Sequence, residues 1–392
     1  PSIGLSGIIS EMVKLPEFIS YLKLRTSYTE VGSPITQTGI TPGTVTDPMS
    51  GGVINPISTY PYPDFKPERT KSYEVGINAR FLNGRISFDG TFYQSNTYNQ
   101  TFLSVMSPAT GYSGFYVQAG NVRNRGVEMT LGYNDTFGKV NYSTHLTYTA
   151  NQNKIVEMVH DYRNPIDNSL VNITELTLKE VGDVYLREGY SMSDVFTTGI
   201  LQRGRDGKLV EEGNGYQVDR SQRIRLGSAD PDFTMGWRHD INYKNISLGL
   251  MITGRFGGIV TSQTQAFMDA FGVSKVSAEA RDNGGVMLDG HRYDAERYYN
   301  TVGGQGLMSY YTYDATNVRL QELSLTYSLP KKWLGDVFNN ATISFVGRNL
   351  FMFYRKAPFD PDMNGSTGTY NRSDFFMAPS LRNLGFSIKF SL

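Results

Sequence analysis

Several features are missing from this sequence, and each absence excludes a class of protein. Cysteine is absent from the 392 residues, which excludes disulfides and thiolate metal sites. No apolar run approaches the roughly 18 residues of a transmembrane helix, so a helical membrane protein is excluded. Neither sign of charge is in excess, because 37 basic and 37 acidic residues give a formal net charge of +0. A nucleic-acid partner normally leaves a basic excess, so that function class is disfavoured.

Aromatic residues and glycine are abundant instead. The chain has 26 Tyr, 22 Phe and 41 Gly. Tyr and Phe favour pleated, half-buried surfaces, and Gly marks turns and bulges, so the composition indicates an all-β protein. The mean hydropathy of -0.35 suits a soluble protein, but barrel strands that are apolar on only one face hide the membrane signal from such an average.

Strict alternation of apolar and polar residues is the main sequence signal. From Tyr73 to Phe81 one face is apolar and the other polar, and residues 86–92 repeat the pattern after an Asn83-Gly84 turn. Further alternating segments lie at 127–133, 246–252, 323–327, 343–345 and 384–392. The sequence therefore predicts antiparallel strands and hairpins with two chemically distinct faces.

The joins between these strands distinguish a membrane barrel from a soluble β-sandwich or propeller. Short and long joins alternate along the chain without a break. Outer-membrane barrels have short periplasmic turns and long extracellular loops, whereas a sandwich has no reason to keep this order. We therefore predict an antiparallel transmembrane β-barrel with long extracellular loops. About eleven strands are counted, which fits half of a barrel of about 22 strands.

The order of short and long joins also divides the chain into regions. Residues 1–392 are interpreted as the C-terminal portion of the barrel, because they open without a starting Met or a signal segment. Residues 151–231 are predicted to form an extracellular subdomain, since a barrel strand there would break the order of the joins. Residues 258–316 are predicted to form a long extracellular loop with short helices.

Several phrases, in order over nearly the whole chain, carry a family resemblance. Segments 24–32, 68–76, 120–128, 231–236, 314–320 and 347–351, with 359–361 following, are similar to segments of the SusC/RagA family of TonB-dependent transporters. The resemblance implies a Gram-negative outer-membrane location, energy coupling through TonB and a SusD-like lipoprotein lid. It also implies an N-terminal plug, which is absent from this chain. The family's cargo is usually an oligosaccharide and sometimes a peptide.

The resulting functional hypothesis is active import of oligosaccharides across the outer membrane. Import of peptides by the same type of transporter and passive diffusion through a porin are the alternatives. A porin shares the alternation, and the family resemblance argues against it.

Aromatic residues in the long loops are the candidate ligand contacts, because flat rings stack on sugar faces and hydroxyls bond to sugar or peptide groups. The alternative is that these rings pack the loops together or form an aromatic girdle. The candidates are Tyr298, Tyr299, Tyr310, Tyr311, Tyr313, Phe115 and Tyr116, with Tyr60 and Tyr62 in a Pro-rich stretch.

Metal and catalytic chemistry find little support in the sequence. Asp360, Asp362 and Asn364 match the opening of an EF-hand loop, but Asn371 stands where the closing Glu is needed, so a turn-rich loop is preferred over a calcium site. The 4 histidines have no metal-ligand spacing. A nucleophile with a base cannot be assigned, and we predict no enzyme and no cofactor.

The last nine residues alternate to the end of the chain. We expect this strand to descend to the periplasm and to carry the terminal signal read by the barrel-assembly machinery. The signal would consist of Phe386, Ile388, Phe390 and Leu392.

Overall fold

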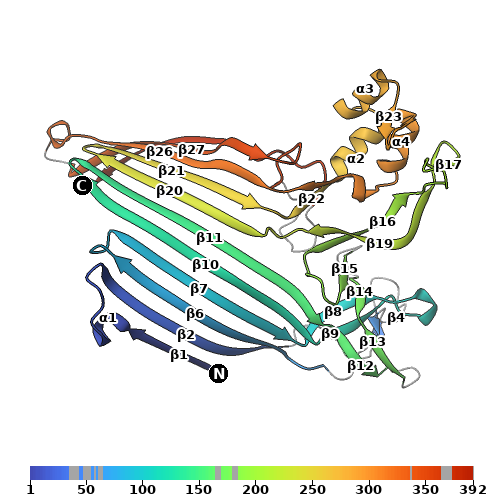
Figure 1. Cartoon of the computed structure of the whole chain (residues 1–392), viewed down its shortest axis with the longest axis horizontal. Coiled ribbons are helices and arrows are strands. Elements are labelled where there is room, and N and C mark those ends of the chain that lie inside the picture. The colour runs from blue at the N-terminus through green and yellow to red at the C-terminus, as the bar shows by residue number, and fades with distance from the viewer. Residues whose placement is uncertain are drawn as a thin grey trace.

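One large antiparallel sheet dominates the protein. The computed structural model describes residues 1–34, 44–46, 54–56, 59–60, 65–163, 169–178, 184–335, 338–362 and 373–391. Each of the eleven strands pairs with the next sheet strand along the chain (Figure 1). The strands are β1 (Ser2–Ile8), β2 (Ile19–Ser33), β6 (Glu68–Phe81), β7 (Ile86–Tyr98), β10 (Asn121–Phe137), β11 (Val140–Glu157), β20 (Phe233–Tyr243), β21 (Ile246–Phe256), β26 (Asn317–Ser328), β27 (Asn340–Arg355) and β29 (Asn383–Ser391). The predicted count of about eleven is confirmed.

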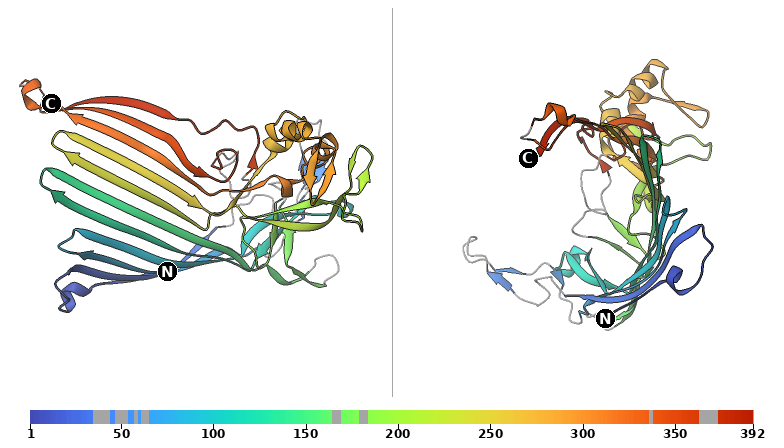
Figure 2. Two further views of the ribbon diagram at one scale, coloured as in Figure 1. Left: turned by 45° about the horizontal axis from the view of Figure 1, so that its top comes forward. Right: turned by 90° about the vertical axis from the view of Figure 1, so that its left-hand side faces the viewer.

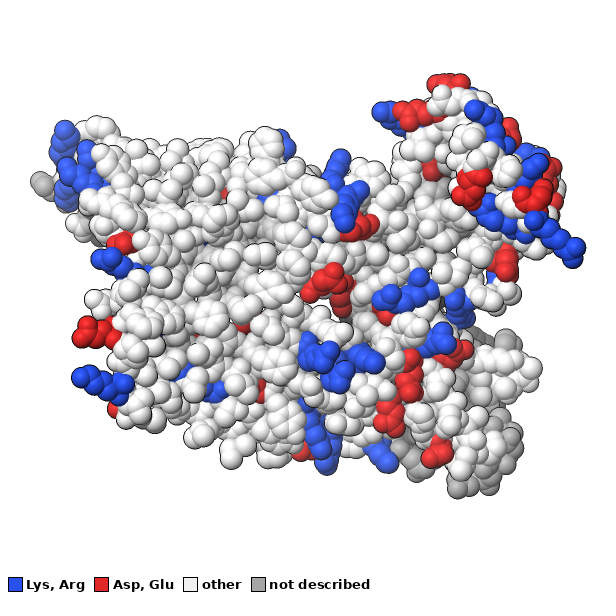
Figure 3. Space-filling view, viewed as in Figure 1, with Lys and Arg blue, Asp and Glu red and all other residues white. Residues whose placement is uncertain are grey.

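The sheet is strongly curved, and its convex side is the face seen in Figure 1 (Figure 2, right). Register explains the two faces that the sequence predicted. Val75 lies opposite Phe92, which lies opposite Val127, so one face carries apolar side chains. On the other face Asn78 donates to Asp89 at 2.7 Å and Arg25 forms an ion pair with Asp89 at 2.7 Å. Charged side chains are sparse over the middle of the convex face and gather at its two ends (Figure 3).

Short and long connections lie at opposite ends of the strands, here named the turn end and the loop end (Figure 1). The turn end holds α1 (Ile9–Met12), η4 (Lys331–Trp333) and tight hairpin turns. Asn83 and Gly84 adopt positive φ values of 56° and 85°, which is the backbone that a two-residue hairpin requires. The predicted alternation of short and long joins is therefore confirmed.

The first excursion, residues 158–232, leaves the sheet at the loop end. Its strands pair with one another: β12 with β13, β14 with β15, β16 with β19, and β17 with β18. Their bounds are β12 (Val159–Arg163), β13 (Leu170–Ile173), β14 (Glu175–Thr177), β15 (Tyr185–Arg187), β16 (Asp194–Leu201), β17 (Glu211–Glu212), β18 (Gly215–Tyr216) and β19 (Val218–Ser228). The excursion begins later than residue 151, because β11 continues to Glu157.

The second excursion, residues 257–316, lies beside the first at the loop end (Figures 1 and 2). It contains β22 (Ile259–Ser262), α2 (Gln263–Ala270), α3 (Lys275–Asp282), β23 (Val286–Leu288), β24 (His291–Tyr293), α4 (Ala295–Val302), η3 (Met308–Tyr310) and β25 (Thr312–Asp314). Side chains of Ser262, Ser274 and Asp294 cap the N-termini of the three helices. Within the described residues no helix is long and apolar enough to cross a membrane.

The two larger buried cores among the described residues lie at the loop end. The first joins both excursions, since Leu201, Leu209 and Tyr216 pack against α4 and Leu307. The second core includes Phe102, Val117, Ile155 and Leu186. It lies near the small sheet of β5 (Thr59–Tyr60), β8 (Gln100–Val105) and β9 (Gly114–Ala119), with η2 (Pro108–Thr110) in the β8–β9 connection. The remaining short strands are β3 (Thr44–Thr46), β4 (Ile54–Pro56) and β28 (Ser373–Asp374).

Candidate functional site

Three of the predicted ligand-binding tyrosines belong to the first core. Tyr298 and Tyr299 on α4 are each 8% exposed, and Tyr311 is 3% exposed. Burial raises the pKa of the Tyr298 and Tyr311 hydroxyls well above their usual range. Rings enclosed in this way offer almost no surface to a ligand. The structure corrects the prediction for these three residues: their physical role is to pack the two excursions together.

Tyr310 and Tyr313 are half-buried and also make structural contacts. The Tyr310 hydroxyl accepts a hydrogen bond from the Leu201 backbone N–H at 3.2 Å, which ties the two excursions together. The Tyr313 ring lies edge-on to Phe359 at 5.5 Å. Both residues therefore link segments that are distant in sequence.

The other aromatic candidates lie on or near β9. Tyr116 is buried against Phe65, with ring centroids 5.6 Å apart, and Phe115 packs against the second core. Tyr60 contacts Tyr112 at 5.0 Å. Tyr116 is thus corrected to a packing residue, and Tyr62 lies outside the described residues.

A cavity of about 690 Å³ opens between the two excursions. Ligand pockets commonly have volumes of about 300–1,000 Å³. Its wall combines aromatic rings of Tyr185, Phe196 and Phe267 with polar groups of Arg220, Arg223 and Gln305. Apolar faces mixed with a few convergent polar groups are typical of small-molecule sites. The cavity is the best candidate for a ligand site within the described part of the chain.

An irregularity in the β16–β19 pair brings both arginines to this cavity. Thr198 lies opposite Arg223 and Ile200 opposite Asp219, so β19 spans four steps where β16 spans two. Residues three apart on a regular strand point to opposite faces, whereas extra residues in a bulge re-aim the side chains. Gly199 supplies the required backbone on the facing strand, with a φ of 105°.

The glycine-rich segment 303–306 forms another part of the wall. It follows α4, and a Cβ at Gly303 would clash with the carbonyl oxygen of Ala266 on α2. A Cβ at Gly304 would clash with the carbonyl oxygen of Asn300. Glycine is therefore needed here for the close packing of α4 against α2.

The cavity is electropositive. Its described lining contains Arg220 and Arg223 but no Asp or Glu. The Arg223 guanidinium lies over the Tyr185 ring at 4.1 Å from its centroid. Burial and a hydrogen bond to Glu175 raise the pKa of Tyr185 to about 12, so this phenol stays neutral at physiological pH.

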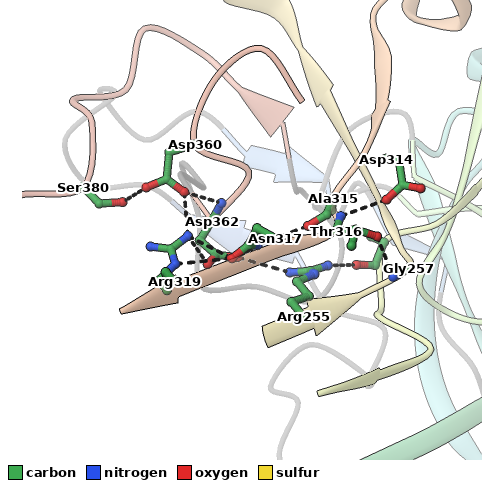
Figure 4. Close-up of polar contacts among 11 residues, drawn as sticks. Arg255, Gly257, Asp314, Ala315, Thr316, Asn317, Arg319, Asp360, Asp362 and Ser380 are labelled. Atoms are coloured by element: carbon green, nitrogen blue, oxygen red, sulfur yellow. Dashed lines mark hydrogen bonds and ion pairs between the residues drawn. The ribbon is translucent and has the colours of Figure 1, made fainter. Parts of the chain in front are cut away.

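A separate polar cluster attaches the connection between β27 and β29 to the sheet (Figure 4). Arg319 on β26 has a side chain that is 7% exposed, and it forms ion pairs with Asp360 at 2.8 Å and Asp362 at 2.6 Å. Burial alone would raise the pKa of Asp360, but hydrogen bonds from Ser380 and Arg319 hold it below the usual range.

The same cluster bears on the calcium prediction. A guanidinium occupies the space between the two carboxylates of Asp360 and Asp362, where a cation would otherwise lie. Asn364 lies outside the described residues. Within the described ranges, no group of three His, Cys, Asp or Glu side chains is arranged to hold a metal. The turn-rich loop remains the prediction, with calcium as its alternative.

The predicted assembly signal lies on the edge strand β29. It pairs with β27, with Phe345 opposite Phe386 and Ile343 opposite Ile388. Phe386, Ile388 and Phe390 are all exposed, and Leu392 lies outside the described residues. Their register places them on the apolar face of the sheet, as a lipid-facing strand requires.

Comparison with known proteins identifies the family. Residues 10–253 match the family model described as TonB dependent receptor-like, beta-barrel. The chain belongs to this family. The TonB-dependent transporter family and the all-β barrel fold predicted from the sequence are thereby confirmed. Proteins of this family are transporters of the Gram-negative outer membrane and not enzymes.

Named relatives and solved structures agree with this assignment. TonB-dependent receptor P3 of Formosa agariphila is 25% identical over 95% of this chain and 40% of its own length. TonB-dependent receptor P26 of the same organism is 25% identical over 92% of this chain and 38% of its own length. The chain thus spans about 40% of these relatives.

The likeness to solved structures concerns the fold. The structure of the RagAB peptide transporter covers 99% of this chain with a TM-score of 0.72 at 16% identity, and 42% of that chain is matched. The RagAB peptide importer in its open-open state covers 100% of this chain with a TM-score of 0.71 at 18% identity, again matching 42% of that chain.

Sequence reasoning did not single out the cavity arginines. Arg220 and Arg223 lie in an Arg-rich run, 219–225, and that run was the available signal. Because the two arginines are three positions apart, regular alternation assigns their side chains to opposite faces of the strand. Only the bulge opposite Gly199 brings both side chains to the cavity.

Proposed function

We propose that this chain forms part of a TonB-dependent importer that carries oligosaccharides across the outer membrane. The observation that carries the proposal is the cavity between the two excursions. Two of its rings, Phe196 and Phe267, suit the flat faces of sugars. Its arginines, Thr197, Gln263 and Gln305 supply donors and acceptors for hydroxyl groups.

The proposed orientation puts the loop end outside the cell and the turn end in the periplasm. Long extracellular loops and short periplasmic turns are the rule in outer-membrane barrels. The eleven strands would be half of a closed barrel of about 22 strands. The plug and the contact with TonB would come from further sequence, in keeping with the greater length of the curated relatives.

We further propose a SusD-like lipoprotein lid over the loop end. Exposed apolar side chains on the second excursion support a partner there: Phe271, Val273 and Val276 are each more than half exposed. Phe375 and Phe376, whose rings contact Phe267, add to this surface. Apolar patches of this kind on an otherwise polar unit are typical of protein interfaces.

Deletion of residues 258–316 tests the proposed function. The deletion removes α2, α4 and the 303–306 wall of the cavity, so uptake of labelled oligosaccharides should be lost while the barrel still assembles. Deletion of the exposed turn 205–208, which lies outside the cavity lining, is the control and should leave uptake intact. Unchanged uptake by the 258–316 deletion variant, present at its normal level in the outer membrane, would contradict the proposal.

Peptide import is the second candidate, because the RagAB peptide transporter shares this fold. Competition between labelled oligosaccharide and peptide mixtures in the same cells separates the two. A passive porin is tested by removing TonB. Import by the proposed transporter should stop, whereas uptake that continues without TonB would establish passive diffusion.

A further inference from the structure

We propose that the cavity binds a carboxylate group of its ligand through Arg220 and Arg223, so that the cargo is acidic. The inference rests on the proposed import function and deepens it by naming a chemical class. A carboxylate on a sugar ring and the C-terminal carboxylate of a peptide share this chemistry. The guanidinium fork matches a carboxylate with two parallel hydrogen bonds, which makes arginine the suitable residue.

The first support is that two arginines without an ion pair to any described residue line one cavity, whereas several arginines elsewhere in the two excursions are paired with a carboxylate. Arg225 forms an ion pair with Asp194 at 2.8 Å, and Arg297 forms one with Glu211 at 3.1 Å. Arg203 is paired with Asp289. Among the described residues, Arg220 and Arg223 form no ion pair and donate to neutral oxygens, although both line one cavity. Two like charges beside one cavity favour the binding of an anion.

The second support is that neutral groups hold both guanidinium groups in place. Arg220 donates to the carbonyl oxygen of Thr198 at 3.4 Å and to that of Gln305 at 3.2 Å. Arg223 lies over the Tyr185 ring and donates to the Thr177 hydroxyl at 3.1 Å. These contacts orient the side chains without neutralising their charge. A ligand therefore gains charge-assisted hydrogen bonds at little cost in side-chain ordering.

The third support is the construction of the site. The bulge opposite Gly199 gives the two arginines a common face that regular strand pairing would deny them. A Cβ at Gly199 would approach Leu307 of the first core at 2.8 Å and Arg220 at 3.2 Å. The arginine geometry is therefore coupled to the packing between the excursions.

The test uses the whole transporter purified in detergent and four probes. Oligogalacturonate is compared with a neutral galactose oligomer of equal length, and a peptide with a free C-terminus is compared with its C-terminal amide. Isothermal calorimetry should show one acidic probe binding about tenfold or more tightly than its neutral match. The pair that shows this preference identifies the source of the carboxylate.

Variants assign the preference to the two arginines. Arg220→Gln with Arg223→Gln should reduce the preference to about twofold or less, and the double Lys variant should retain part of it, because charge remains without the fork. Arg205→Gln removes the same charge outside the cavity lining and should change nothing. Protease protection of the excursions verifies that each variant is folded.

The outcomes separate the two proposals. Equal binding of acidic and neutral probes, or a preference that survives in the folded double Gln variant, overturns the carboxylate site and leaves import in place. If wild-type transporter binds none of the four probes and cells import none, both proposals fail.

Discussion

The large sheet and the external excursions differ in how far their apolar side chains are exposed. On the sheet, Phe92, Trp237 and Phe345 are between 43% and 50% exposed on the convex face. In the excursions, Tyr311 and Leu307 are almost fully enclosed. Exposure of such side chains to water is unfavourable, at roughly 25 cal/mol for each Å² of apolar surface. The difference shows that the sheet is completed by lipid, whereas the excursions form their own cores as soluble domains do.

The largest expected effect comes from placing charge on the lipid-facing side of the sheet. Phe386→Lys with Ile388→Lys should reduce the outer-membrane level at least about tenfold, because each cation costs about 2–4 kcal/mol near the bilayer centre. Ser387→Lys, on the opposite face of β29, is the control and should insert well. Quantitative immunoblotting of membrane fractions gives the measurement, and normal levels of the double variant would overturn the lipid-facing assignment.

A buried leucine and an exposed leucine provide a matched pair for the same comparison. Leu307→Ala empties a site that is 0% exposed in the first core and should destabilise the excursions by about 2–5 kcal/mol. Leu325 lies on the convex face of β26 and is 48% exposed. Leu325→Ala should leave the stability of the excursions unchanged. Protease added to intact cells should cleave only the Leu307 variant within the excursions. Equal resistance of both variants would contradict a self-sufficient loop core.

A smaller effect is expected at the bulge. Gly199→Ala forces a residue with a Cβ into a φ of 105° and against Leu307, at a cost of about 1–3 kcal/mol. The displacement should reach Arg220, so affinity for an acidic probe should fall several-fold while the barrel assembles normally. Calorimetry checks this, with Gly213→Ala as a control at another positive φ where no atom lies within 4 Å of the added Cβ. An unchanged affinity would show that the bulge does not position the arginine.

The smallest expected effect is the pH dependence of the segment that Arg319 holds through Asp360, between β27 and β29. Because Asp360 has a lowered pKa in the folded protein, its ion pair stabilises the folded state at neutral pH. The stabilisation is lost only as the pH falls through that lowered value. Hydrogen exchange of residues 356–362, corrected for intrinsic rates, should therefore be constant from about pH 7 to pH 5 and increase below about pH 4. Asp360→Asn should exchange faster at pH 7 and lose this dependence. An identical acid response in that variant would contradict the role of Asp360.

The sequence predicted the sheet well because a strand between lipid and water imposes a period of two on every residue. Tyr73 to Phe81 and the Asn83-Gly84 turn could be assigned without knowledge of any distant contact. The register of β6 with β7 then followed from the hairpin.

The excursions could not be predicted in the same detail because their cores are assembled from distant segments. The Tyr298 and Tyr299 rings are buried by residues such as Leu201 and Tyr216, which lie about 80 to 100 positions earlier. A tyrosine that packs and a tyrosine that binds ligand look identical in the sequence. Likewise, the common face of Arg220 and Arg223 depends on an irregular register that alternation does not reveal.

Cysteine labelling in intact cells tests the central claim, that the sheet spans the outer membrane with the excursions outside. This chain has no cysteine, so within it a membrane-impermeant maleimide reacts only with an introduced one. Arg205→Cys, in the first excursion, should be labelled in intact cells. Lys139→Cys, in the exposed β10–β11 turn, should be labelled only after the outer membrane is permeabilised. Labelling of Lys139→Cys in intact cells, or protection of Arg205→Cys, would contradict the account.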